Sequence, residues 1–396
     1  MTAALVRAVL DVAAWGLACA WCVRAFGAVR GMPKLPDLAT MMGNRSPLSM
    51  PSLTVVVPAR NEAAHIAATL QSLVVQDYMW MQICVVNDRS TDTTGAIIDE
   101  FAARYPKRVH AMHITELPEG WLGKTHAMHI VATHSHAQFL LFTDADVIFE
   151  PTILRRALAY IEREKAAHLV VAPTLTVRSW GEGTMLGFFQ VMSIWALRPW
   201  CVADPTAQRD AIGVGAFNLV RRDALEQIGG LEPQRLSIIE DATLGIRIKA
   251  ARLPQRLAVA PGMVNVHWAP GGRGIVKVMT KNLFSAVNFR PLLLLGACVG
   301  ILLLFLAPLA GLFGWWTLLP SLISLLCIAM AYRAMQRMTS INTRYFWTYP
   351  IGTVAFVWAL LRSMLAAWIR RGVVWRGTHY PLSELRKHNS PMQWRR

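Results

Sequence analysis

The sequence predicts an α/β domain with a mostly parallel central sheet, placed between transmembrane helices at both ends of the chain. Two observations lead to this prediction. Residues 48–290 alternate short β-branched runs with helical stretches, which is the pattern of a parallel sheet with helices on both faces. The regions on either side contain apolar runs long enough to cross the roughly 30 Å hydrocarbon core of a bilayer.

The composition supports the membrane part of this prediction. Hydrophobic residues make up 54% of the 396 residues and charged residues 16%, whereas soluble domains have roughly 25% charged residues. This excludes intrinsic disorder and argues against an ordinary cytosolic enzyme. The formal net charge of +16 is concentrated beside apolar segments, as in membrane proteins with positive cytoplasmic loops. We therefore expect the membrane as a partner, and no nucleic acid.

The first membrane segment covers residues 9–29. Arg24, Arg30 and Lys34 lie in or after it, whereas only Arg7 precedes it. This asymmetry predicts a cytoplasmic C-terminal end. A cleaved signal peptide is the alternative, but no clear cleavage site follows the segment, so we expect an uncleaved anchor.

The C-terminal region contains further apolar segments. Leu292–Ala310 and Trp315–Tyr332 carry no charge and predict a helical hairpin. Phe346–Ile369 is also apolar, but it includes Arg362, and an arginine in mid-membrane costs about 3 kcal/mol or more. A membrane span and a re-entrant or interfacial helix both remain open for this segment.

We therefore divide the chain into four parts. Residues 1–47 are an N-terminal anchor and linker, and residues 48–290 form a cytoplasmic domain. Residues 291–369 form the C-terminal membrane helices, and residues 370–396 form a basic cytoplasmic tail. This division predicts a multi-pass protein of the inner (cytoplasmic) membrane, with the middle domain in the cytoplasm.

The middle domain is expected to begin with four strands, each followed by a polar or helical segment. The strands are predicted at Leu53–Val57, Gln82–Asn87, Val109–Ile114 and Phe139–Thr143. We expect Pro58 to end the first strand and Asn61 to cap a helix that runs to about Gln76. Thr91 and Pro151 are expected to open the helices that follow the second and fourth strands.

Polar clusters follow three of these strands, at Arg60-Asn61-Glu62, Asn87-Asp88 and Asp144-Ala145-Asp146. Open α/β sheets bind ligands beyond the carboxyl ends of their strands, so these clusters are candidates for a site. No strand is followed by a Gly-x-Gly-x-x-Gly or Walker sequence, which disfavours dinucleotide-binding and P-loop folds.

Two adjacent carboxylates such as Asp144 and Asp146 repel each other in a cleft unless a cation joins them. Alternation along a strand would put both on one face, where Mg²⁺ or Mn²⁺ could bind them together with substrate phosphates. The alternative is a helix N-cap. Gly123-Lys124 offers a flexible backbone and a cation, which together suit a phosphate. Glu240-Asp241 opens a helix, and a carboxylate at that point could be a general base or a partner of the helix dipole.

The ordered set of motifs resembles the family 2 glycosyltransferases. The matching pieces, in the order of that family, are Thr54–Glu62, Val85–Asp92, Gly120–Lys124, Thr143–Asp146 and Ile239–Gly245. The resemblance implies a nucleotide-diphospho-sugar transferase fold with one central sheet. It also implies a metal, Mn²⁺ or Mg²⁺, at Asp144 and Asp146, with Asp241 as the catalytic base. The substrate-binding residues that we expect are Pro58, Arg60, Glu62, Asp88, Lys124, Asp144 and Glu240.

The function implied by the resemblance is inverting, metal-dependent sugar transfer from a nucleotide-diphospho-sugar, expected to be a UDP-sugar. Processive synthases carry Gln-x-x-Arg-Trp after the base, but this chain has His267–Asn282 in its place. The absence of the Gln-x-x-Arg-Trp motif favours the transfer of one sugar per acceptor. His267 and Arg273 are expected to help hold the diphosphate. Gly120–Lys124 and Trp375–Tyr380 are similar to membrane glycosyltransferases that modify carotenoid, hopanoid or ceramide-type lipids, so we expect a lipid acceptor and a role in glycolipid biosynthesis.

Two alternatives remain at this point. One is a polyprenyl-phosphate sugar transferase, which would use a phosphate acceptor instead of a hydroxyl. The other is a catalytically inactive membrane scaffold with the same fold. The intact acidic residues Asp88, Asp144, Asp146 and Asp241 argue against the scaffold.

Overall fold

The computed structural model describes residues 3–41, 43 and 45–388, and this described part divides into two compact units. The sheet unit comprises Leu35–Thr176, Cys201–His267 and the chain from Val374 onward. The helical unit comprises the chain up to Lys34, Val177–Trp200 and Trp268–Val373. Residues 389–396 of the predicted basic tail lie outside the described residues.

The sheet unit is built on a mostly parallel sheet, as predicted. Its strands are β1 (Leu53–Ala59), β2 (Met81–Asp88), β3 (Val109–Ile114), β4 (Phe139–Phe142), β6 (His168–Ala172), β8 (Asn218–Arg221) and β9 (Gln255–Val259). Their order is β3-β2-β1-β4-β8-β6-β9. β8 is antiparallel to both of its neighbours, whereas the other pairs are parallel.

Two smaller sheets are also present in the described part of the chain. β5 (Val147–Phe149), β10 (Val264–Val266) and β7 (Thr174–Leu175) form one, in that order. β11 (Gly372–Trp375) and β12 (Thr378–Pro381) form a hairpin near the C-terminus, which is followed by α14 (Leu382–His388).

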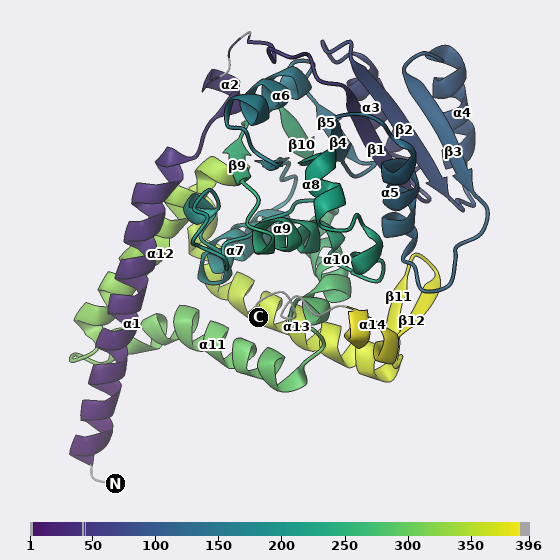
Figure 1. Cartoon of the computed structure of the whole chain (residues 1–396). Coiled ribbons are helices and arrows are strands. Elements are labelled where there is room, and N and C mark those ends of the chain that lie inside the picture. Colours follow the sequence, from purple (N-terminus) through teal and green to yellow (C-terminus); the bar gives the residue numbers. More distant parts are fainter. Residues whose placement is uncertain (1–2, 42, 44, 389–396) are drawn as a thin grey trace. The chain divides into compact units, whose positions relative to one another are not determined.

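Helices cover both faces of the main sheet, which confirms the predicted layer order (Figure 1). Buried side chains of α3 (Ile66–Val74), α4 (Thr94–Arg104) and α6 (Ile153–Arg163) pack on one face. Those of α5 (Gly123–His134), α8 (Arg222–Gln227) and α9 (Glu240–Ala250) pack on the other. Strand β1 is buried along its whole length, because alternate residues contribute to the two cores.

The first strand and the first helix differ from the prediction. β1 continues through Pro58 to Ala59. β4 pairs with β1 only as far as Val56, so the N–H that proline lacks is not needed for a hydrogen bond to β4. Asn61 does not cap α3, which begins at Ile66. Asn61 has φ +54°, and its side-chain oxygen accepts a hydrogen bond from the Thr91 N–H at 2.8 Å, so it joins two loops.

Two other helix starts were predicted slightly too early. α4 begins at Thr94, whose N–H donates to Asp92 Oδ1 at 3.0 Å. α6 begins at Ile153, because β5 occupies residues 147–149 first and Glu150 then accepts from the Thr152 N–H at 2.9 Å.

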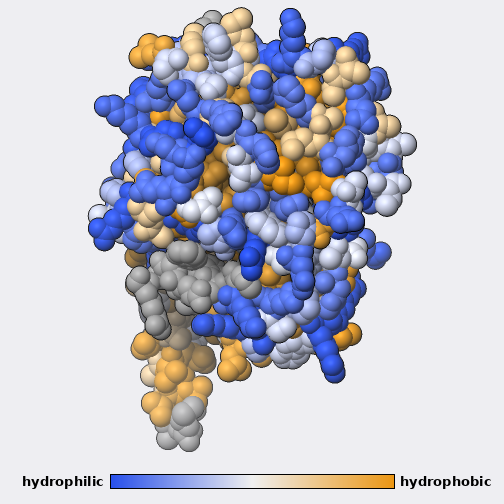
Figure 2. Space-filling view, turned by 45° about the vertical axis from the view of Figure 1, so that its right-hand side comes forward, coloured by the Kyte–Doolittle hydropathy of each residue, from blue (hydrophilic) through white to orange (hydrophobic). Residues whose placement is uncertain are grey.

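The helical unit contains α1 (Ala3–Gly31), α7 (Trp180–Ala196), α10 (Gly271–Ala286), α11 (Pro291–Ala310), α12 (Leu318–Thr339) and α13 (Tyr349–Ile369). Among the described residues, four helical segments are long and apolar enough to cross a membrane: Ala4–Lys34, Pro291–Phe313, Leu318–Thr339 and Thr343–Ile369. Part of α1 shows a hydrophobic surface in Figure 2. Among the large apolar side chains of α1, Val9 is 56% exposed and Val12 is 73% exposed.

The ends of these helices carry features typical of membrane proteins. Arg7 of α1 lies over the rings of Trp315 and Trp316, at 4.7 and 4.4 Å from the ring centroids, so the start of α1 and the α11–α12 turn lie at the same end of the unit. Tryptophan rings are enriched at the membrane–water interface. α7 buries Phe188 and Val191 and packs as a core helix of the helical unit.

Candidate active site

The predicted polar clusters meet at one edge of the main sheet. β1 lies between β2 and β4, and all three are parallel, so their carboxyl ends lie side by side. Arg60 and Glu62 follow β1, and Asp88 is the last residue of β2. Arg60 Nη1 lies 3.8 Å from Asp88 Oδ2, which joins the first two clusters.

Asp88 is held tightly against the start of α5. It is 3% exposed, and Arg89 Nε donates to its Oδ1 at 2.7 Å. A Cβ atom at Gly123 would overlap Asp88 Oδ2 and would lie 3.0 Å from Arg89 Nη2. Glycine at position 123 leaves room for this carboxylate, whereas a side chain there would force Asp88 to shift, and this gives a structural reason for Gly123.

Lys124 joins the third cluster to the start of α9. Its Nζ lies 2.5 Å from Asp144 Oδ1 and 2.5 Å from Glu240 Oε1. Burial lowers the pKa of Lys124, but Asp144 and Glu240 raise it by more, so the net shift is upward and the ammonium stays charged. The sequence suggested a phosphate partner for Lys124; here the lysine bridges two carboxylates.

Asp144 and Asp146 lie in the turn between β4 and β5, and not within a strand as the alternation argument assumed. The Asp144 N–H donates to the Gly215 carbonyl at 3.1 Å, and a Cβ atom at Gly215 would lie 2.5 Å from Asp144 Oδ2. Burial, Asp144 and Glu62 raise the pKa of Asp146 to about 7. This carboxyl therefore faces more negative than positive charge.

These two carboxylates suit a hard divalent cation. Within the described residues, no group of three or more His, Cys, Asp or Glu side chains is placed to hold a metal ion. Mg²⁺ is commonly held by one or two carboxylates together with substrate phosphates, and Asp144 and Asp146 match that smaller set. The space that Gly215 leaves beside Asp144, and the excess negative charge at Asp146, fit a cation at this turn.

Asp241 lies at the start of α9, next to Glu240. Burial first, and then Glu240, raise the pKa of Asp241 to about 7. The helix dipole was expected to favour the ionised form, but burial opposes it here. A Cβ atom at Gly213 would overlap the Asp241 carbonyl, so a close backbone contact fixes the start of this helix.

A buried polar network behind α9 was not predicted. The Gln255 amide nitrogen donates to His168 Nδ1 at 2.8 Å, so the proton of the neutral ring lies on Nε2, which donates to Asn218 Oδ1. Asn218 Nδ2 donates to the Asp241 carbonyl at 3.4 Å, and Gln255 Nε2 to the Gly245 carbonyl at 3.1 Å. The network supports the backbone of α9 from within the core.

The remaining predicted residues lie as follows. Pro58 is at the end of β1, beside Arg60 and Glu62. His267 directly follows β10 and is the last residue of the segment Cys201–His267 of the sheet unit. Arg273 lies in α10 of the helical unit, so its contribution to the site stays a prediction. Arg376 was not predicted as a site residue, but its Nη2 donates to Glu62 Oε1 at 2.9 Å.

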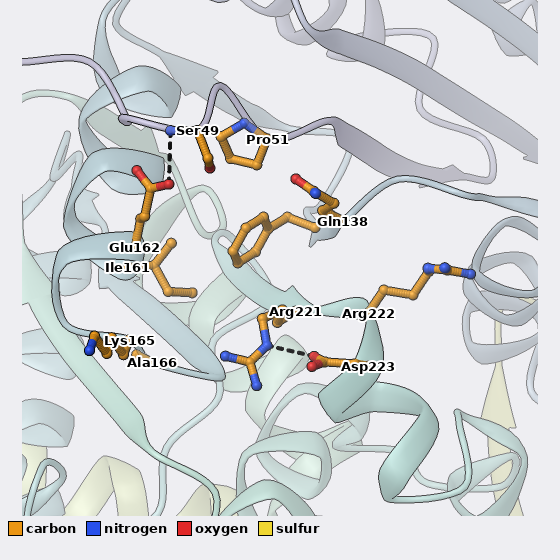
Figure 3. A pocket seen from close by; sticks show the side chains of 11 residues that line it. Ser49, Pro51, Gln138, Ile161, Glu162, Lys165, Ala166, Arg221, Arg222 and Asp223 are labelled. Atoms are coloured by element: carbon orange, nitrogen blue, oxygen red, sulfur yellow. Dashed lines mark hydrogen bonds and ion pairs between the residues drawn. The ribbon is translucent and has the colours of Figure 1, made fainter.

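A separate cavity of about 570 Å³ lies at the opposite end of β4, where Phe139 begins the strand (Figure 3). Arg221 and Asp223 line it and form an ion pair of 2.5 Å. On the far side, Glu162 accepts from the Ser49 N–H at 3.0 Å. Asp144 follows the other end of β4, so this cavity is distinct from the acidic cluster.

Comparison with known proteins identifies similar sequences and folds. Residues 54–229 match the family model described as glycosyl transferase family 2. A 4,4'-diaponeurosporenoate glycosyltransferase of Staphylococcus aureus (strain MRSA252) is 25% identical over 290 residues, which are 72% of this chain and 71% of that protein. The protein of the same name from strain bovine RF122 / ET3-1 is 24% identical over 289 residues, with the same shares covered.

Among solved structures, the mannosyltransferase PcManGT from Pyrobaculum calidifontis has a TM-score of 0.51 and 20% identity, over 90% of this chain and 99% of that chain. This likeness shows the fold. The chain carries a glycosyl transferase family 2 domain and is a glycosyltransferase.

Proposed function

We propose that this protein transfers one sugar from a nucleotide-diphospho-sugar to a hydroxyl group of a membrane lipid, with inversion at the anomeric carbon. The observation that carries the proposal is the acidic cluster Asp88, Asp144, Asp146 and Asp241 at the carboxyl edge of the sheet. It occurs in a chain with four span-length apolar segments among its described residues.

The donor binds along the edge that β1, β2 and β4 share. Pro58, Arg60, Glu62 and Asp88 contact the nucleoside end, and the donor that we propose is a UDP-sugar. The fold neighbour PcManGT was solved with GDP-Man and Mn²⁺, which supports a nucleotide-diphospho-sugar here without choosing the base. Competition between UDP and GDP for the purified protein tests the choice.

Asp144 and Asp146 are the residues that would hold Mn²⁺ or Mg²⁺. When bound, such an ion neutralises negative charge on the departing diphosphate. Lys124 keeps the Asp144 carboxylate oriented through its 2.5 Å contact. His267 and Arg273 are proposed to help hold the diphosphate.

Asp241 is the proposed base. It takes the proton of the acceptor hydroxyl as that oxygen attacks the anomeric carbon from the side opposite the diphosphate, and this attack inverts the configuration. A base is most effective with a pKa near the working pH, and the pKa of Asp241 is raised to about 7. Glu240 is a weaker candidate, because its carboxylate is already paired with Lys124 at 2.5 Å.

The proposed acceptor is a membrane lipid. The similar Staphylococcus aureus proteins are named for a carotenoid acid, 4,4'-diaponeurosporenoate, which supports an apolar acceptor. We propose the inner membrane as the location, with residues 1–47 as anchor, residues 48–290 in the cytoplasm and residues 291–369 as membrane helices. A reporter fused at residue 150 should be active only in its cytoplasmic form, and activity only in the periplasm would overturn this orientation.

Purified protein, a radiolabelled UDP-sugar and a total lipid extract test the proposed reaction. We expect label in an organic-soluble product that is stable to mild acid and base. A product with a labile phosphodiester linkage would instead identify a polyprenyl-phosphate acceptor. Absence of both products with every nucleotide sugar tried would favour the inactive scaffold.

A further inference from the structure

The β11–β12 hairpin, drawn in yellow in Figure 1, has a two-residue turn formed by Arg376 and Gly377. Both residues have positive φ, +47° and +85°, as a type I′ turn requires. Glycine and asparagine are the residues that suit such a turn, and a bulkier residue in the left-handed region costs on the order of 1–2 kcal/mol. The turn itself therefore does not explain the arginine at position 376.

The contacts of Arg376 supply a reason for it. Its Nη1 donates to the Arg60 carbonyl at 2.9 Å, and its Nη2 donates to Glu62 Oε1 at 2.9 Å. A Cβ atom at Gly377 would lie 3.7 Å from Arg60 Nη2. The tip of the hairpin thus contacts the segment after β1 that is proposed to bind the donor.

The charges at this contact are unbalanced. Among the described residues that form it, the guanidinium groups of Arg60, Arg89 and Arg376 face the carboxylates of Glu62 and Asp88. Burial lowers the pKa of Arg60, and its neighbours Arg89 and Arg376 lower it further. The three guanidinium groups share these two carboxylates, so this set carries one excess positive charge, and an anion placed beside it would be attracted.

We propose that the turn of the β11–β12 hairpin is part of the donor site, and that Arg376 binds the diphosphate of the nucleotide sugar. This inference rests on the function proposed above. Arginine suits the role because its planar guanidinium makes two parallel hydrogen bonds to phosphate oxygens. Glu62 and the Arg60 carbonyl hold the side chain at the site before the donor arrives.

The test uses the full-length protein in detergent or nanodiscs and measures the affinity for UDP, UMP and uridine by calorimetry. Arg376→Asn is the informative variant, because asparagine fits a type I′ turn and has no guanidinium group. Arg371→Asn is the matched control: Arg371 is exposed and also has a positive φ, of +50°. Arg376→Lys keeps the charge but loses the paired hydrogen bonds.

We expect Arg376→Asn to weaken UDP binding by about 10-fold or more, the loss typical of a charge-assisted hydrogen bond. Uridine binding should be unchanged, Arg376→Lys should be intermediate, and Arg371→Asn should match wild type. The thermal unfolding temperature of Arg376→Asn should equal or exceed that of wild type, which separates binding from folding.

UDP affinity of Arg376→Asn within twofold of wild type would overturn the inference and leave the proposed function standing. An equal loss for uridine and UDP would also overturn it, since Arg376 would then contact the nucleoside. If the wild-type protein bound neither UDP nor GDP, the proposed function would fail, and the inference with it.

Discussion

Asp241→Asn should stop proton transfer while leaving the donor site intact. Asparagine keeps the size and most of the hydrogen bonding of aspartate but has no basicity. General base catalysis contributes roughly 10²- to 10⁴-fold to a rate, so we expect kcat to fall by at least about 10²-fold. UDP affinity should change little, because Asp241 is not among the residues around Arg60 and Asp88.

The pH dependence of the wild-type enzyme gives a second measure of the same group. With a pKa of about 7, a carboxyl is about 10% ionised at pH 6 and about 90% ionised at pH 8. The base must be ionised to accept a proton, so kcat should fall on the acid side, by roughly tenfold between pH 8 and pH 6. Glu240→Gln removes a negative neighbour and should move this limb to lower pH.

Sugar transfer to lipid, followed with a radiolabelled donor at saturating concentration, is the assay for both experiments. Transfer by Asp241→Asn at a near wild-type rate, together with an inactive Glu240→Gln, would show that the base is misassigned. If neither substitution mattered, the pair would be only a helix N-terminus, and the catalytic role of α9 would be wrong.

Three other predictions follow from the same geometry. Chelator should abolish transfer, Mn²⁺ or Mg²⁺ should restore it, and full activity in chelator or in Asp146→Ala would contradict the role of the Asp144–Asp146 turn. Gly123→Ala should displace Asp88, whose oxygen the new Cβ would overlap, and should weaken UDP binding because Asp88 is proposed to contact the nucleoside; calorimetry showing unchanged affinity would contradict this. Burial lowers the pKa of His168 to about 4, against about 6.5 when unfolded, so the unfolded chain binds the proton more tightly. The neutral His168 ring therefore makes its whole contribution to the free energy of unfolding above pH 6.5, and this contribution should fall by up to about 3 kcal/mol as the pH drops toward 4. Thermal unfolding should show this extra pH dependence in the wild-type protein and not in His168→Gln. Parallel curves for the two proteins would refute it.

The alternation of strands and helices could be predicted because it depends on local sequence. Each predicted strand corresponds to an observed one within one or two residues, as with Val109–Ile114. Local pattern also gave the clusters at the strand ends, since parallel neighbours bring their carboxyl ends to one edge. It did not reveal that β8 enters the sheet antiparallel between β4 and β6, because that pairing depends on distant segments.

Partners far apart in the sequence account for most of what was missed. Arg376 and Glu62 are 314 residues apart, and no periodicity links them. The Arg-Gly pair before Thr378 was a usable signal for a tight turn, but not for what the turn contacts. Lys124 likewise meets Glu240 only after α5 and α9 have packed on the same face of the sheet.

The helix start at Ile66 was missed for a related reason. Asn61 is a good N-cap residue in isolation, but its side chain is committed to the Thr91 N–H on another loop. Tertiary contacts thus override the local signal next to the site, where Arg60, Asn61 and Glu62 lie in a bend that precedes α3.

Mass spectrometry of lipids from cells that express the wild-type protein or Asp241→Asn tests the central claim most directly. The account predicts a membrane lipid whose mass increases by one glycosyl residue with the wild-type protein and not with Asp241→Asn. Equal amounts of this lipid with both proteins, a ladder of repeated sugars, or no glycosylated lipid at all would contradict it.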